Sequence, residues 1–140
     1  MALKLIDSSV WIDFFSGGDT PSSRMVRRLA EHPAQIAVTQ PIVFEILAGA
    51  PATGRRRIEQ VLGSFVMLDL DVAIDFHQAL ELYRAVRSTG HTVRSAFDCL
   101  IASVAIRRGA EVVHRDVDFE RIAAVARDLR TVAVGREGPR

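Results

Sequence analysis

Short apolar segments alternate along this chain with longer segments of helical pattern, and this alternation constrains the fold more than any other feature. We expect strands at residues 3–6, 35–38, 65–70, 111–114 and 129–134. We expect helices at residues 9–16, 21–31, 41–49, 53–62, 72–88, 95–108 and 119–127. Such alternation predicts an α/β/α sandwich, in which right-handed crossovers cover both faces of a central, mostly parallel twisted sheet.

The chain has 140 residues, a length typical of one domain. We expect a single domain at residues 1–134 and a disordered tail at residues 135–140. The longest stretch without Asp, Glu, Lys or Arg runs only from residue 32 to residue 44, which is too short to span a bilayer. Asp7 and Asp13 interrupt the apolar N-terminus, where a signal peptide needs an unbroken hydrophobic segment. We therefore predict a cytoplasmic protein.

The residue types present exclude several classes of chemistry. Lys4, inside the first predicted strand, is the only lysine, whereas a Schiff-base enzyme or a phosphate-binding loop needs a lysine elsewhere. Cys99 is the only cysteine, so it forms no intramolecular disulfide or multi-thiolate zinc site, and we expect it to be a small buried hydrophobe. The four histidines lack the spacing of zinc motifs, and we expect them to be structural or solvated. The formal net charge of +1 favours no class of partner.

Acidic side chains follow two predicted strands near their carboxyl ends. Asp7 comes directly after the strand at residues 3–6, and Asp116 and Asp118 follow the strand at residues 111–114. In open parallel α/β sheets, ligands bind beyond the carboxyl ends of the strands, where the strand order reverses. The alternative is that these acids cap the helices that follow them, and Asp118 is a stronger candidate for a cap than Asp116.

Two further acids interrupt strongly apolar helices. Glu45 has three apolar residues on each side, and Asp98 lies near the start of the helix predicted at residues 95–108. Ala102 and Ala105 keep the Asp98 face of that helix small, which allows neighbouring segments to approach. A buried carboxylate without a partner is costly. Glu45 could instead lie on a solvent-exposed helix face, and Asp98 could serve only the helix dipole.

Asp7, Glu45, Asp98 and Asp116 come from four segments and together predict one acidic cluster. Each pair of carboxylates about 4 Å apart costs about 4 kcal/mol at an effective dielectric constant of about 20. The cluster must therefore take up protons or bind hard divalent cations. A ligand set made only of oxygen atoms favours Mg²⁺ or Mn²⁺ over zinc.

Four motifs, in this order along the chain, resemble those of the PIN-domain nucleases. They are Asp7-Ser8-Ser9-Val10-Trp11, Glu45 in an apolar helix, Thr92-Val93-Arg94-Ser95 with Asp98-Cys99-Leu100-Ile101-Ala102, and His114-Arg115-Asp116-Val117-Asp118-Phe119. Within that family the chain most resembles the VapC ribonuclease toxins of bacterial toxin–antitoxin modules, over about residues 3–134. Ser8 stands where many members have Thr, and it keeps the hydroxyl group.

The resemblance implies a Mg²⁺- or Mn²⁺-dependent endoribonuclease with Asp7, Glu45, Asp98 and Asp116 as its catalytic acids and metal ligands. Asp118 is a further candidate ligand, and we favour Asp116 because it follows the strand more closely. In this family, metal-assisted attack by water leaves a 5′-phosphate and a 3′-hydroxyl. The resemblance also implies an RNA substrate such as tRNA or rRNA, a cognate VapB-like antitoxin and a homodimer.

Three residues beside the acids are candidates for substrate binding. Arg94 stands four residues before Asp98, within reach of a scissile phosphate or of an acid. The alternative for Arg94 is therefore a structural ion pair with the cluster. Ser8 or Ser9 could hold a water molecule or the Asp7 side chain, or could serve only to cap the helix.

Two surface features leave alternatives open. The arginines in the helix predicted at residues 21–31 and the run at residues 55–57 could contact RNA phosphates or form solvated helix faces. Trp11, Phe14 and Phe15 form one helical stripe, which is suited to the core or to contact with a second subunit or an antitoxin segment.

Two rival functions remain. A PIN-like module without activity could keep the fold only to bind protein or RNA, although all four acids are present. A Mg²⁺-dependent phosphatase of the haloacid-dehalogenase type also uses an Asp at a strand end. It requires a second acid two residues later, where this chain has Ser9, and a suitable lysine. Mn²⁺ binding separates the nuclease from the inactive module.

Overall fold

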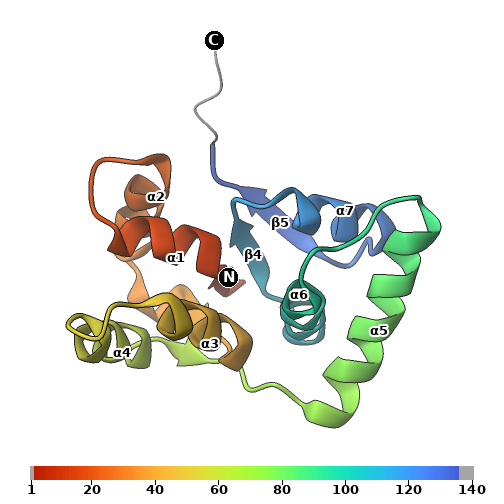
Figure 1. Cartoon of the computed structure of the whole chain (residues 1–140), viewed down its shortest axis with the longest axis horizontal. Helices are drawn as coiled ribbons and strands as arrows, with labels where there is room; N and C mark the ends of the chain where they lie inside the picture. Colours follow the sequence, from red (N-terminus) through yellow and green to blue (C-terminus); the bar gives the residue numbers. More distant parts are fainter. Residues whose placement is uncertain (1, 136–140) are drawn as a thin grey trace.

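A five-stranded parallel sheet forms the centre of the computed structural model, which describes residues 2–135 (Figure 1). The strand order is β3-β2-β1-β4-β5, and every neighbouring pair is parallel. The strands are β1 (Lys4–Ile6), β2 (Ile36–Val38), β3 (Val66–Met67), β4 (Glu111–His114) and β5 (Arg130–Ala133). The predicted α/β sandwich with a parallel central sheet is therefore confirmed.

Seven α-helices within the described residues cover the two faces of the sheet. They are α1 (Ser8–Phe15), α2 (Pro21–Leu29), α3 (Gln40–Gly49), α4 (Arg55–Gly63), α5 (Val72–Ser88), α6 (Ala96–Arg108) and α7 (Val117–Val125). The chain moves from β1 to β3 in one direction and then crosses to β4 and β5, so right-handed crossovers place α1–α4 on one face and α5–α7 on the other. Figure 1 shows these two groups on opposite sides of the strands.

The apolar core surrounds the middle strands because helices cover them on both faces. Leu5, Ile6 and Ile36 are fully buried. Trp11 is also fully buried, and its ring stacks on that of Phe15 with the centroids 5.6 Å apart. The aromatic stripe of α1 therefore belongs mainly to the core, which was one of the two interpretations of this stripe in the sequence.

Side-chain caps fix the starts of the helices that carry acids. Asp7 accepts a hydrogen bond from the main-chain nitrogen of Ser9 at the start of α1, and Ser95 accepts one from Phe97 at the start of α6. Helix α6 ends at Gly109, whose φ of 65° is left-handed and favours glycine. These caps set where each helix leaves the carboxyl edge of the sheet.

Several predicted boundaries were wrong by a few residues. The strand predicted at residues 65–70 is only Val66–Met67, because after Leu68, whose N–H donates to the carbonyl of Val38, the chain turns into the Asp71 cap of α5. The helix predicted from residue 119 begins at Val117, because Asp116 is its cap. Apart from Gly135, the predicted disordered tail lies outside the described residues.

No helix within residues 2–135 combines the length and the apolar character needed to cross a membrane.

Candidate active site

The strand order reverses between β1 and β4, which lie side by side at the centre of the sheet. Asp7 follows β1, and its main-chain N–H donates to the carbonyl of Val113 in β4 at 2.8 Å. Asp116 lies two residues beyond the end of β4. Both acids therefore occupy the part of an α/β sheet where ligands generally bind.

Two helices bring further carboxylates to this edge. Oxygen atoms of Asp7, Glu45 and Asp98 lie within 4.8 Å of one another, although Glu45 belongs to α3 and Asp98 to α6. Oxygen atoms of Asp98, Asp116 and Asp118 form a second group within the same distance. Asp98 belongs to both groups, so the structure brings all the predicted acids together in one cluster.

Asp7 presents one carboxylate oxygen without a partner. Its side chain is only 3% exposed. Oδ2 accepts hydrogen bonds from the hydroxyl and the main-chain nitrogen of Ser9, whereas Oδ1 is buried and has no hydrogen-bond partner among the described residues. An unsatisfied buried carboxylate oxygen is costly. A cation ligand is the simplest way to satisfy it.

The cluster resists full ionisation. Burial, followed by the charges of the neighbouring acids, raises the pKa of Asp98 to about 8. Burial also raises the pKa of Asp7 against the opposing effect of the Ser9 hydrogen bonds. For Glu45, burial and then the charge of Asp7 raise the pKa. Without a bound cation, Asp98 therefore carries a proton near neutral pH.

Two serine hydroxyls position these acids. Ser8 Oγ donates to Glu45 Oε1 at 3.2 Å. Ser9 Oγ donates to Asp7 Oδ2 at 2.6 Å and accepts from the main-chain N–H of Arg115 at 3.3 Å. Ser9 therefore connects the end of β1 to the segment after β4, which holds Asp116.

Arg94 forms ion pairs with the second carboxylate group. Its Nη2 lies 2.8 Å from Asp116 Oδ1, and its Nε lies 3.2 Å from Asp118 Oδ2. Its main-chain N–H also donates to Asp118 Oδ2. These hydrogen bonds to the two acids raise the pKa of the Arg94 guanidinium. The structure thus places Arg94 in the ion pair that the sequence left as the alternative to phosphate binding.

Asp116 and Asp118 have different roles in the structure. Asp116 is the cap of α7, and its Oδ1 accepts from the main-chain N–H of Asp118 at 3.0 Å. The sequence favoured Asp118 over Asp116 as the cap of this helix, and that expectation was wrong. The Asp118 side chain is fully buried and also contacts Arg121 at 3.4 Å. Sequence analysis missed Arg121, although opposite charges three residues apart on a helix are a recognisable signal.

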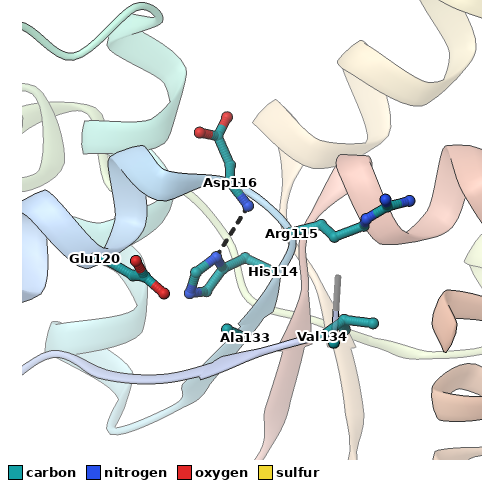
Figure 2. Close-up of a pocket in the computed structure, with 7 residues that line it drawn as sticks. His114, Arg115, Asp116, Glu120, Ala133 and Val134 are labelled. Atoms are coloured by element: carbon teal, nitrogen blue, oxygen red, sulfur yellow. Dashed lines mark hydrogen bonds between the residues drawn. The ribbon is translucent and has the colours of Figure 1, made fainter. Parts of the chain in front are cut away.

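His114 supports the main chain at Asp116. The imidazole is fully buried, and its Nδ1 accepts a hydrogen bond from the Asp116 N–H at 3.1 Å. Figure 2 shows that the Asp116 carboxylate points away from the ring while its nitrogen faces it. Glu120 and Val134 complete a cavity of about 310 Å³ beside these residues. His114 therefore has a structural role, as expected from the sequence.

A buried ion pair between α5 and α6 lies outside the cluster and was not predicted. Asp75 is fully buried and accepts from Arg107 Nε at 3.1 Å and Arg107 Nη2 at 2.7 Å. Ser103 and the main-chain N–H of Asp71 also contact its carboxylate at 2.7 Å. Burial raises the pKa of Asp75, but these hydrogen bonds outweigh it, and the pKa is lowered.

Other residues singled out in the sequence lie outside the cluster or beside it. Cys99 is buried, and burial raises the pKa of its thiol to about 12. The arginine run at residues 55–57 is exposed. The burial of Cys99 agrees with the small buried hydrophobe expected from the sequence, whereas the exposure of residues 55–57 fits both RNA contact and a solvated helix face.

Comparison with known proteins identifies the family. Residues 4–125 match the PIN domain. Over 123 residues the chain is 46% identical to Ribonuclease VapC11 of Mycobacterium tuberculosis and to a VapC ribonuclease of Mycobacterium bovis, which covers 86% of this chain and 92% of each relative. The chain belongs to the PIN-domain family and, within it, to the VapC ribonucleases. The resemblance seen in the sequence motifs is thereby confirmed.

Solved structures show the same PIN fold. The DNA-bound VapBC of Salmonella typhimurium superposes with a TM-score of 0.76 at 19% identity, covering 96% of this chain and 100% of the other. VapBC2 of Rickettsia felis, bound to a fragment of promoter DNA, gives a TM-score of 0.73 at 16% identity, covering 94% and 98%. At these identities the likeness concerns the fold.

PIN nucleases depend on divalent metal ions, and the acidic cluster fits such an ion. Its ligand atoms are all oxygen, which hard divalent cations prefer. The unpartnered Oδ1 of Asp7 supplies an independent sign that a cation belongs there. Asp7, Glu45 and Asp98 would hold it.

Proposed function

We propose that this PIN-domain protein is a metal-dependent endoribonuclease toxin that hydrolyses RNA with Asp7, Glu45, Asp98 and Asp116. The observation that carries the proposal is the buried Oδ1 of Asp7 at the switch point of the sheet, which has no hydrogen-bond partner in the described part of the chain and lies beside two other carboxylates. The names of the VapC relatives support RNA as the substrate. Mg²⁺ or Mn²⁺ is the proposed ion, because both accept ligand sets made only of oxygen.

The chain's own groups have separable tasks in this proposal. When bound, the ion supplies positive charge that acidifies an attacking water and stabilises the phosphoryl transition state. Ser9 fixes the orientation of Asp7, and Ser8 fixes that of Glu45. His114 holds the main chain at Asp116. No lysine or histidine is then needed as a general base.

We further propose three properties of the protein in the cell. A VapB-like antitoxin neutralises it, as supported by structural neighbours that are VapBC complexes. It acts in the cytoplasm, where RNA such as tRNA and rRNA is found. It forms a homodimer, supported by the apolar residues Val72, Phe76 and Leu80, which are exposed on one stripe of α5. Sedimentation of wild-type protein and Leu80→Glu tests the dimer, which the variant should weaken.

The test of activity is cleavage of RNA by purified protein in Mg²⁺ or Mn²⁺. We expect cleavage by the wild type, none in EDTA and none by Asp98→Asn. Asp128→Asn is the matched control, because it removes an exposed carboxylate that lies between α7 and β5 and belongs to neither carboxylate group. The products should carry 5′-phosphate and 3′-hydroxyl ends. A 2′,3′-cyclic phosphate, or full activity in EDTA, would contradict metal-assisted attack by water.

A further inference from the structure

The two carboxylate groups that share Asp98 differ in the positive charge beside them. Among residues 2–135, the hydrogen bonds to Asp7 and Glu45 in the first group come only from Ser8 and Ser9. The group with Asp116 and Asp118 is contacted by two guanidinium groups, from Arg94 and Arg121. One group is therefore uncompensated and the other is largely neutralised by the protein itself.

Both oxygen atoms of Asp118 and one of Asp116 already accept hydrogen bonds. Asp118 uses Oδ2 for Arg94 and Oδ1 for Arg121. Asp116 uses Oδ1 for Arg94 Nη2 and for the main-chain N–H of Asp118. A divalent ion in this group would have to displace charge-assisted hydrogen bonds that are already made. In the first group it would find the unpartnered Oδ1 of Asp7.

Arg94 contacts both Asp116 and Asp118 and is also exposed to solvent. Its side chain is 70% exposed, although Nε and Nη2 are both paired. No acceptor within residues 2–135 pairs with its Nη1. A guanidinium in this position keeps the N–H groups of Nη1 for a phosphate oxygen while it balances two carboxylates.

We propose that Arg94 takes the place of a second metal ion, so that the protein binds a single Mg²⁺ or Mn²⁺, held by Asp7, Glu45 and Asp98. This inference rests on the proposed function of the same site. Arg94 then supplies, next to the ion, the positive charge that a second ion provides in two-metal nucleases. The Arg94 guanidinium is a covalent part of the protein. It therefore provides positive charge beside the substrate without a second bound ion.

The test is the number of Mn²⁺ ions bound by the metal-stripped full chain, measured by isothermal titration calorimetry. We expect one ion for the wild type and two for Arg94→Gln, because the substitution removes the positive charge and the side-chain hydrogen bonds of Arg94 from Asp116 Oδ1 and Asp118 Oδ2. Arg121→Gln is the matched control. It also removes a cation beside Asp118 but leaves the Arg94 bridge to Asp116, so we expect one ion.

Each outcome separates this inference from the function on which it rests. Two ions in the wild type, or one ion in Arg94→Gln, would overturn the inference and leave a metal-dependent nuclease intact. No binding by the wild type would overturn both. Circular dichroism checks that Arg94→Gln is folded. The wild-type stoichiometry tests the inference even if that variant does not fold.

Discussion

Asp75 and Asp98 are both buried, but hydrogen-bond donors surround Asp75 and other acids surround Asp98. Asp75 is fully buried between α5 and α6 and receives two hydrogen bonds from Arg107 and others from its neighbours. Asp98 is 5% exposed at the start of α6. Within the described residues, no donor is hydrogen-bonded to its carboxylate, and its close neighbours are other acids.

The difference between these two aspartates separates a structural acid from a ligand-binding one. The hydrogen bonds of Arg107 and its neighbours overcome the effect of burial and lower the pKa of Asp75. Burial and the neighbouring acids raise the pKa of Asp98 to about 8. The protein compensates the first charge internally and leaves the second for an external cation.

The largest expected effect is the loss of activity in Asp98→Asn. Because Asp98 belongs to both carboxylate groups, this change should lower RNA cleavage by about 1000-fold or more, as for residues that act as a unit. Double variants with Asp7→Asn should lose little more. Single-turnover cleavage assays measure both effects. Losses that multiply independently would contradict a cluster that acts as a unit.

The next effect concerns the pH dependence of stability without metal. The raised pKa of Asp98 means that its stabilising contribution is fully present below the unfolded pKa of 3.8 and is lost as pH rises to about 8. From pH 5 to pH 8 the free energy of unfolding in EDTA should therefore fall by up to about 4 kcal/mol. Urea denaturation measures it. A slope that is equally steep in Asp98→Asn would assign the effect to other groups.

Asp75→Asn should weaken folding rather than the active site. Removing one partner of a buried ion pair costs about 3 kcal/mol, so the urea midpoint should fall while the folded fraction still cleaves RNA. Because the pKa of Asp75 is lowered, its contribution is present above pH 3.8 and is lost as pH falls through the folded-state value. This sign is opposite to that of Asp98. Reduced cleavage by the folded Asp75→Asn variant would contradict the claim that Asp75 serves only the stability of the fold.

The smallest expected effect is the contrast between Asp116 and Asp118. Asparagine caps helices about as well as aspartate, so Asp116→Asn should keep its stability and yet lose at least about 10-fold more activity than Asp118→Asn. The kinetic difference corresponds to about 1.4 kcal/mol. Asp118→Asn should instead lower the melting temperature, because its buried carboxylate pairs with Arg94 and Arg121. Equal losses of activity would indicate that Asp118 contributes to the reaction as much as Asp116 does.

The sequence predicted the part of the site that follows from strand order. Asp7 and Asp116 both come after strands, and parallel strands bring their carboxyl ends to one edge. Glu45 and Asp98 were predicted from their apolar surroundings, since an acid within an apolar helix needs a partner. Their approach to Asp7 depends on how α3 and α6 cross that edge, which local sequence does not encode.

The contacts that sequence analysis missed connect residues far apart in the chain. Arg107 in α6 pairs with Asp75 in α5, 32 residues earlier, and no local sequence pattern predicts this pair. Arg94 was expected near the cluster. Whether its guanidinium pairs with an acid or stays available for a phosphate depends on the path of the segment after β4, which carries Asp116 and Asp118. The cap of α7 was assigned to Asp118 because helix boundaries from sequence shift by a residue or two.

The most direct test of the account is the response of the melting temperature to Mg²⁺. An ion that binds the folded cluster stabilises the native state, so the wild type should melt about 5 °C or more higher in saturating Mg²⁺ than in EDTA. Asp75→Asn should melt lower but keep the same Mg²⁺ shift, whereas Asp98→Asn should lose the shift. An equal shift in the wild type and Asp98→Asn would contradict the claim that the uncompensated cluster is the metal site.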